Sequence, residues 1–145
     1  MSGGGIQSHI KRSDFIDLQK PPLEGEQQKA LFAWAELSLG KYPDLQWLFH
    51  ITNEGKRSKA HGADLVRQGL KKGVPDLCLP VPRGKYHGMY IEMKRIGEKL
   101  TDDQKKWLSG LAKNGYCCYT ADKGWEDAKN ALVWYLNLKE DKDEV

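Results

Sequence analysis

The sequence predicts an α/β fold in which a β-sheet is flanked by helices on both faces. Stretches with a 3.6-residue apolar period alternate with short β-branched or aromatic stretches, in the order helix, strand, helix, strand, strand, helix, strand, helix. The chain has 145 residues, of which 39% are hydrophobic. That is enough for one domain that buries roughly two-thirds of its unfolded surface. Because a sheet needs apolar cover, we expect helices on both of its sides.

We expect this single domain to span residues 23–138, between two polar ends. Residues 1–22 are glycine-rich, then polar, and end in Pro21-Pro22, so we interpret them as a flexible arm. Residues 139–145, KEDKDEV, are interpreted as a charged, solvated tail. The longest apolar runs are too short to cross a bilayer and the N-terminus lacks a signal-peptide stretch, so we expect a cytoplasmic protein.

In the first half of the chain the pattern predicts two helices around one strand. Good helix formers dominate residues 23–39, and Gly40 and Pro43 are expected to end that helix. Residues 46–52, QWLFHIT, are aromatic and β-branched and predict a strand followed by a turn. A short helix is expected within residues 60–72.

The second half predicts a hairpin followed by a helix, a strand and a helix. Residues 74–80 and 89–94 are expected to form the two strands of the hairpin. Residues 101–104 fit a capping box that starts the next helix. A strand over 116–121 and a helix over 125–138 complete the chain.

Charge is distributed unevenly along the chain. The net charge is only +3, but between residues 53 and 72 six basic residues stand against two acidic ones, a local balance of +4. The basic residues are Lys56, Arg57, Lys59, Arg67, Lys71 and Lys72. As a group they could line a groove for phosphates, and singly they could be solvated surface charges.

Cysteine and histidine spacings predict neither a disulfide nor a zinc site. The three cysteines are odd in number and show no CxxC spacing, and the four histidines form neither HxH nor HExxH. We interpret the cysteines as small apolar side chains in strands.

The hairpin carries an unusual set of charges. Asp76 is the only charged residue of its strand, and Glu92 and Lys94 share one face of the next strand with Tyr90. Pairing of the two strands would bring Asp76 and Glu92 together. Two carboxylates 4 Å apart repel by roughly 4 kcal/mol at an effective dielectric near 20, so they need a proton, a cation or a metal.

A divalent metal would give this set of charges a chemical use. Oxygen ligands without imidazole or thiolate suit Mg²⁺ or Mn²⁺ better than zinc. Mg²⁺ on one or two carboxylates, with open positions for water and a phosphate, is equipment for phosphodiester hydrolysis, and Lys94 could orient the water. The alternative that stays open is a buried Asp/Glu/Lys ion-pair cluster without a catalytic role.

Two strings of residues carry a family resemblance. Residues 73–76, GVPD, followed by residues 91–94, IEMK, resemble the PD-(D/E)XK nuclease signature. More narrowly, five stretches between about residues 24 and 136 resemble the VRR-NUC family of virus-type replication and repair nucleases: LEGEQQKALFAWAEL, HITNEG, GVPDLCLP, YIEMKR and LTDDQKKWL.

This resemblance implies a restriction-endonuclease-like fold with a central mixed sheet, and metal-dependent cleavage of DNA that is often branched. The stand-alone phage-type members that the chain resembles are small homodimers acting on four-way junctions. We therefore expect branched DNA and a second copy of the chain as partners, and Mg²⁺ as cofactor, with Mn²⁺ able to substitute.

Carried over residue by residue, the resemblance implies that Asp76 and Glu92 are metal ligands, that the Met93 carbonyl is a backbone ligand, and that Lys94 is the catalytic lysine. The first-helix acid is Glu24 or Glu26, and Glu24 is favoured because it stands four residues before a glutamine.

Two further residues have competing interpretations. Gln104 is either the catalytic glutamine of the family or only the cap of its helix. Asn53 has a functional interpretation, in which it orients active-site groups and belongs with the DNA-binding residues. The competing interpretation is a plain turn residue. Two alternatives to a junction nuclease also remain: a general nicking enzyme or exonuclease, and an accessory module that binds DNA without cutting it.

Overall fold

The computed structural model describes residues 24–52 and 59–139, and these form a four-stranded mixed sheet with helices on both faces. The strands are β1 (Phe49–His50), β2 (Leu77–Leu79), β3 (Met89–Met93) and β4 (Cys117–Ala121), and they lie in that order across the sheet. The β1/β2 and β2/β3 pairs are antiparallel, whereas β3/β4 is parallel. The predicted α/β class with a central mixed sheet is confirmed.

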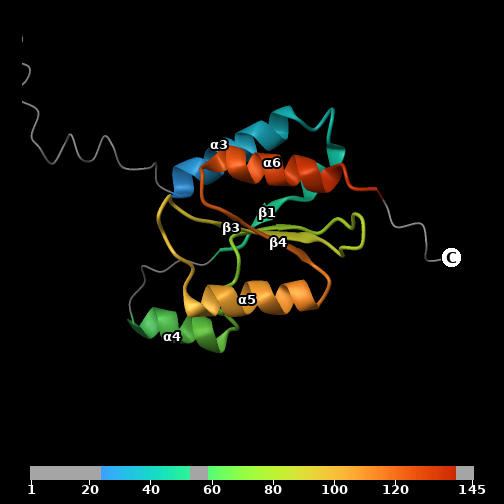
Figure 1. The fold of residues 1–145 in the computed structure, drawn as a ribbon. Helices are drawn as coiled ribbons and strands as arrows, with labels where there is room; N and C mark the ends of the chain where they lie inside the picture. Colours follow the sequence, from blue (N-terminus) through green and yellow to red (C-terminus); the bar gives the residue numbers. More distant parts are fainter. Residues whose placement is uncertain (1–23, 53–58, 140–145) are drawn as a thin grey trace, which may run out of the picture.

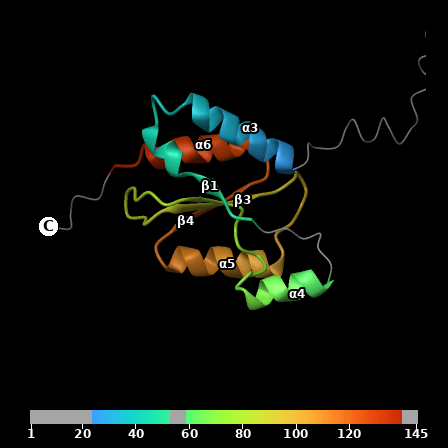
Figure 2. The ribbon, with the colours of Figure 1, turned by 180° about the vertical axis from the view of Figure 1, so that it is seen from behind.

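The helices form one layer on each side of the sheet. Figures 1 and 2 show α3 (Glu24–Leu37) and α6 (Trp125–Leu136) on one face, with α5 (Asp102–Lys113) on the other and α4 (Lys59–Arg67) beside α5. The parallel β3/β4 pair follows from this arrangement, because α5 carries the chain back along the sheet between the two strands. None of the helices in the described ranges has the length and apolar character to cross a membrane.

The hydrophobic core lies between the sheet and the α3/α6 layer. Leu77, Leu79, Met89, Ile91 and Met93 of the sheet are buried. The helices oppose them with buried residues of their own: Leu31, Ala35, Ala128, Ala131, Leu132 and Tyr135. By contrast, no residue of α5 is fully buried. One face of the sheet therefore holds the packed core, and the other face keeps room for polar groups.

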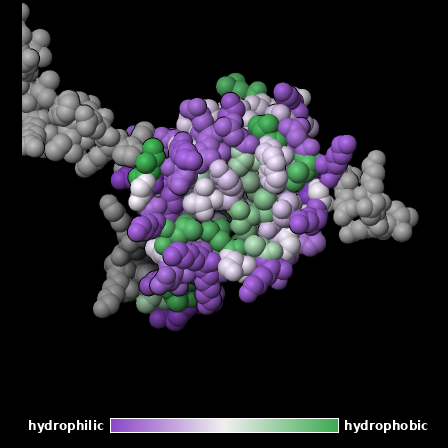
Figure 3. Space-filling model, in the orientation of Figure 1, coloured by the Kyte–Doolittle hydropathy of each residue, from purple (hydrophilic) through white to green (hydrophobic). Residues whose placement is uncertain are grey.

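The surface in the view of Figure 1 is mostly hydrophilic. Figure 3 shows hydrophilic side chains around a central area of more hydrophobic ones, at the level of the sheet between α6 and α5. Tyr119 and Trp134 are two of the exposed large hydrophobic residues of the described chain.

The prediction of a strand over residues 46–52 is wrong for most of its length. Pro43–Trp47 is a 3-10 helix, η1, and only Phe49–His50 is strand. Pro43 at the start of η1 fixes a helical φ, and burial of Leu45 and Leu48 holds the turn against the core. Aromatic and β-branched composition favoured a strand here, and packing of these two leucines outweighed it.

The other elements are confirmed, with shorter bounds at several ends. The first helix stops at Leu37, and the helix within residues 60–72 stops at Arg67, before Gly69 at a φ of 108°. The strand predicted over 74–80 keeps only Leu77–Leu79. Its first residues include Pro75, which has no N–H to donate to a neighbouring strand.

We expect Leu31→Ala to lower the free energy of unfolding by about 2–5 kcal/mol, because Leu31 is 0% exposed and its loss leaves a cavity between α3 and the sheet. Leu37→Ala on the same helix is the matched control, since Leu37 is 89% exposed and should cost less than about 0.5 kcal/mol. Urea titration followed by circular dichroism measures both. Equal losses would contradict the position of the core.

Candidate active site

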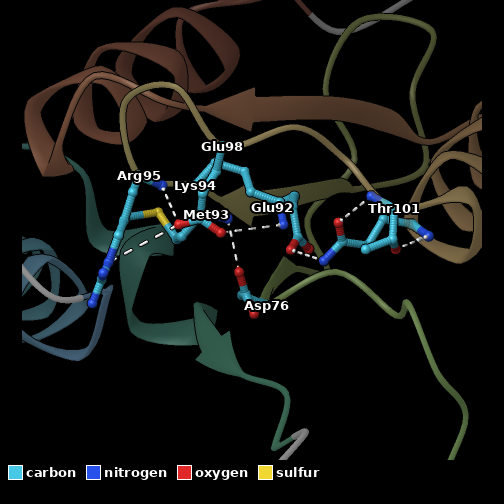
Figure 4. A network of polar contacts seen from close by, with 8 residues as sticks. Asp76, Glu92, Met93, Lys94, Arg95, Glu98 and Thr101 are labelled. Carbon is cyan, nitrogen blue, oxygen red and sulfur yellow. Dashed lines mark hydrogen bonds and ion pairs between the residues drawn. The ribbon is translucent and has the colours of Figure 1, made fainter.

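Asp76 and Glu92 lie opposite each other on the face of the sheet that α5 covers. In the β2/β3 register Leu77 pairs with Ile91 and Cys78 with Tyr90, so one step further back along β2 sets Asp76 opposite Glu92. The hairpin predicted from the sequence therefore brings the two carboxylates together. In Figure 4, Asp76 lies beneath the Met93 backbone and Glu92 lies on the side of Thr101.

Asp76 is held by the backbone of the neighbouring strand. The Met93 N–H donates a hydrogen bond of 2.7 Å to Asp76 Oδ2. On the other side the Ile51 N–H donates to the Asp76 carbonyl at 2.7 Å, so the residue is anchored between β1 and β3. The aspartate thus has a fixed place just before β2, although it lies outside the strand itself.

Burial makes the charged form of Asp76 costly. It raises the pKa of this carboxyl above the usual value, while the Met93 N–H, His50 and Lys94 act to lower the pKa. The net direction is upward because desolvation is the largest of these effects. A cation beside Asp76 would offset this cost, which fits a metal-binding carboxylate.

Glu92 is the most deeply buried of the charged candidate residues whose side chains the structure describes. It is 3% exposed, and its Oε1 accepts a hydrogen bond of 2.9 Å from Gln104 Nε2. Gln104 comes from the first turn of α5, so this contact joins α5 to β3 across the site. Because the amide donor fixes one oxygen of this buried carboxylate, the carboxylate has a defined orientation in the site.

Gln104 makes contacts that bear on both of its interpretations, the helix cap and a place in the candidate site. Its backbone N–H donates to Thr101 Oγ1 at 3.2 Å, and its Oε1 accepts from the Thr101 N–H at 2.9 Å, which completes the capping box. The remaining amide nitrogen of the same side chain donates to Glu92. One glutamine thus caps α5 and donates a hydrogen bond to a carboxylate of the candidate site.

Lys94 provides a positive charge just past the end of β3. Its side chain is 7% exposed, and its Nζ lies 3.9 Å from Glu98 Oε2. The Lys94 backbone N–H donates to the Ala121 carbonyl at 2.8 Å, which extends the β3/β4 ladder by one residue. The lysine is thereby fixed on the same stretch of chain as Glu92 and the Met93 carbonyl.

Gly73 sets the approach of the chain to Asp76. Its φ is 87°, a region that favours glycine, and an added Cβ would lie 2.5 Å from the Asp103 carbonyl carbon. The segment leading into Asp76 therefore presses directly on the first turn of α5. This explains the glycine at the start of the GVPD string in physical terms.

His50 is a site neighbour that the sequence analysis did not single out. It lies in β1, opposite Leu77 of β2, and its charge lowers the pKa of Asp76. Histidine spacing along the sequence tests for zinc sites alone, whereas His50 reaches the site through strand pairing. Its place in the HITNEG string was the one signal that could have indicated it.

The predicted DNA-binding residues are only partly visible. Arg67, Lys71 and Lys72 are exposed, and Arg67 is in a 3.3 Å ion pair with Asp64. Asn53, Lys56 and Arg57 lie outside the described residues.

Two predicted residues are described by their backbone alone. Glu24 is the first residue of α3 and Lys59 the first of α4, and their side chains lie outside the described part. Glu26, the other candidate for the helix acid, is exposed.

The donor set fits a hard divalent cation. Among the side chains that the structure describes, no three His, Cys, Asp or Glu gather as a metal cluster. The available ligands are the carboxylates of Asp76 and Glu92 and the backbone carbonyl of Met93, all oxygens. Mg²⁺ is commonly bound by one or two carboxylates with water and phosphate completing its shell, so this set suffices.

We expect Gly73→Ala to be more destabilising than Gly69→Ala. Both glycines have positive φ, so each alanine costs of order 1–3 kcal/mol in backbone strain. Only at position 73 does the new Cβ collide with the Asp103 backbone, since nothing lies within 4 Å at Gly69. An extra loss of about 1–3 kcal/mol is expected at Gly73 in chemical unfolding. Equal losses would show that the contact with α5 is loose.

Comparison with known proteins agrees with this arrangement. The family model of the VRR-NUC domain matches residues 24–122. A solved structure named VRR_NUC domain protein superimposes with a TM-score of 0.71 at 30% identity, over 83% of this chain and 93% of that chain. No curated protein matches the chain. The solved structure and this chain share a restriction-endonuclease-like core. Because the family model also covers most of the sequence, the chain belongs to the VRR-NUC family, and membership implies a nuclease-type function on DNA.

Proposed function

We propose that this protein is a Mg²⁺-dependent, structure-selective DNA endonuclease that hydrolyses phosphodiesters at Asp76, Glu92 and Lys94. The observation that carries the proposal is the β2/β3 register, which sets the two carboxylates opposite each other with a nearly buried lysine two residues further on. Such a set of charges suits a metal-assisted hydrolase, since the carboxylates can bind the ion and the lysine can act on the water or the phosphate.

The metal would be held by Asp76, Glu92 and the Met93 carbonyl, with Glu24 as a further ligand and Mn²⁺ able to substitute. When bound, such an ion supplies Lewis acidity at a phosphoryl oxygen and makes water easier to deprotonate. Asp76 is kept in place for this role by the Met93 N–H, and Glu92 by Gln104.

Lys94 would act on the attacking water and on the phosphate. Its ammonium group can donate hydrogen bonds to a water molecule and favour loss of that water's proton. It can also stabilise negative charge that develops on a phosphate oxygen in the transition state. Because the side chain is 7% exposed, this charge acts in a partly desolvated place and is worth more than in bulk water.

We further propose that the protein cuts four-way junctions or related branched DNA as a homodimer. The support is the resemblance to the phage-type members of the family, together with symmetry. A two-fold dimer would present two equivalent sites to two strands, as cleavage of a junction requires. Lys71 and Lys72, both exposed, would add phosphate contacts next to the site.

The proposal predicts metal-dependent cleavage that is lost in three isosteric variants. Asp76→Asn, Glu92→Gln and Lys94→Met should each lower cleavage of a labelled four-way junction by at least about a hundredfold, because each removes a charge that the transition state needs. The assay compares junction, linear duplex and single strands in Mg²⁺, Mn²⁺ and EDTA.

Glu36→Gln on the exposed surface of α3 is the control for these variants and should cut like the wild type. Circular dichroism checks that each variant is folded. Equal cleavage of all substrates would make the protein a general nuclease, and binding without cleavage would make it an accessory module. Light scattering that finds only monomer would argue against the junction specificity.

The two roles of Gln104 predict a separation of stability from activity. Thr101→Ala and Gln104→Ala should each destabilise the protein by about 1 kcal/mol, because either one breaks the capping box. Only Gln104→Ala should also raise the Mg²⁺ concentration for half-maximal cleavage, by about 10–100-fold, since it removes the donor that orients Glu92. A Mg²⁺ titration of cleavage measures this difference. An equal Mg²⁺ requirement in both variants would show that Gln104 is a helix cap alone.

A further inference from the structure

A cavity of about 370 Å³ lies along α5, separate from the carboxylates. Its described lining residues are Lys71, Lys106, Trp107, Gly110, Leu111 and Asn114. Five of them lie along α5 and its C-cap, Asn114, in alternating steps of one and three residues. Lys71 comes from the segment between α4 and Gly73. The volume is within the range of about 300–1,000 Å³ that small-molecule sites occupy.

The lining combines an aromatic ring with two positive charges. Trp107 is half-buried, so its indole belongs both to the protein interior and to the cavity wall. Lys71 and Lys106 are exposed at the cavity, and none of its described lining residues is acidic. An aromatic surface for a base beside cations for the backbone is the arrangement with which proteins bind single-stranded nucleic acid.

The cavity begins close to the candidate active site. Gln104, which contacts Glu92, and Trp107 stand three residues apart on α5, about 4.5 Å along the helix axis. Gly73 presses against Asp103 at the start of the same helix, which brings the segment that carries Lys71 to the cavity. A DNA strand leaving Glu92 along α5 would meet the cavity within a few nucleotides, since each nucleotide of a duplex strand spans about 3.4 Å.

We propose that this cavity receives one unpaired base of the DNA strand next to the cut, with its ring on Trp107 and its flanking phosphates on Lys71 and Lys106. The inference rests on the proposed nuclease function and names a feature that this nuclease would recognise. Bases of intact duplex are paired and stacked, and moving one into a cavity costs a few kcal/mol. At a gap or a flap the base is already unpaired, so the cavity selects DNA structures of that kind.

The test compares Trp107→Leu with Trp134→Leu, each in an Asp76→Asn background so that DNA is bound but not cut. Trp134 is a matched control because it is a 52% exposed tryptophan on α6, on the other layer of the molecule. Fluorescence anisotropy gives the Kd for a three-nucleotide gapped duplex and for the matching intact duplex.

Trp107→Leu is expected to raise the Kd for the gapped duplex by about 5–100-fold and to leave the Kd for intact duplex unchanged. Trp134→Leu should change neither. In a second substrate, the three unpaired nucleotides of the continuous strand, which lie opposite the gap, are replaced by abasic ones. This replacement should raise the Kd of the wild type by a similar factor, and it should raise the Kd of Trp107→Leu little further.

The two lysines provide a second readout that does not depend on the tryptophan. Lys71→Ala combined with Lys106→Ala should reduce the slope of log Kd against log salt for single strands by about 1.4, about 0.7 for each lost phosphate contact. Lys113→Ala, on α5 outside the lining, is the control. This variant pair keeps the test decisive if Trp107→Leu does not fold.

Unchanged gap binding in Trp107→Leu, or an equal loss on gapped and intact duplex, would overturn the assignment of the cavity. Junction cleavage by the wild type in the same preparation would show that the nuclease function stands without it. Absence of both DNA binding and cleavage in the wild type would overturn the nuclease function and the cavity assignment together.

Discussion

The candidate site depends on the hydrogen bond from the Met93 N–H to Asp76. This bond joins the residue just before β2 to the backbone of β3. β2 is only three residues long, so Asp76 lies beyond the regular ladder and would otherwise have no fixed place. With this bond, and with the Ile51 N–H on its carbonyl, the aspartate is held opposite Glu92. The antiparallel register thus determines both which carboxylates meet and on which face of the sheet.

The two faces of the sheet divide stability from chemistry. The α3/α6 face buries Leu77, Leu79 and Ile91 against apolar helices, and this packing provides most of the hydrophobic stabilisation. The α5 face contains the buried Glu92 and the nearly buried Lys94, which cost free energy to desolvate. Because the core lies on the opposite face, polar groups can accumulate under α5 without interrupting it.

Periodicity in the sequence was sufficient to predict the helices, the hairpin and the pairing of Asp76 with Glu92, because these depend on local pattern and on strand alternation. It failed over residues 46–52, where burial of Leu45 and Leu48 under the core stabilised a 3-10 turn. That Gln104 both caps α5 and donates to Glu92, and that His50 acts on the pKa of Asp76, could not be predicted. Both require knowledge of how α5 and β1 pack on β3 and β2, which a local pattern does not contain.

The attachment of α5 to the sheet links the separate parts of the site. No residue of α5 is fully buried, so its attachment depends on partly buried side chains beside β4, on the Gln104 contact with Glu92 and on the close approach of Gly73 to Asp103. An element with few buried contacts opens at lower free energy than the core does. Opening of α5 would separate Gln104 from Glu92 and would also break up the cavity beside Trp107. DNA bound in that cavity would therefore stabilise the closed position of α5, and by linkage it would favour the orientation of Glu92 that the proposed metal binding needs.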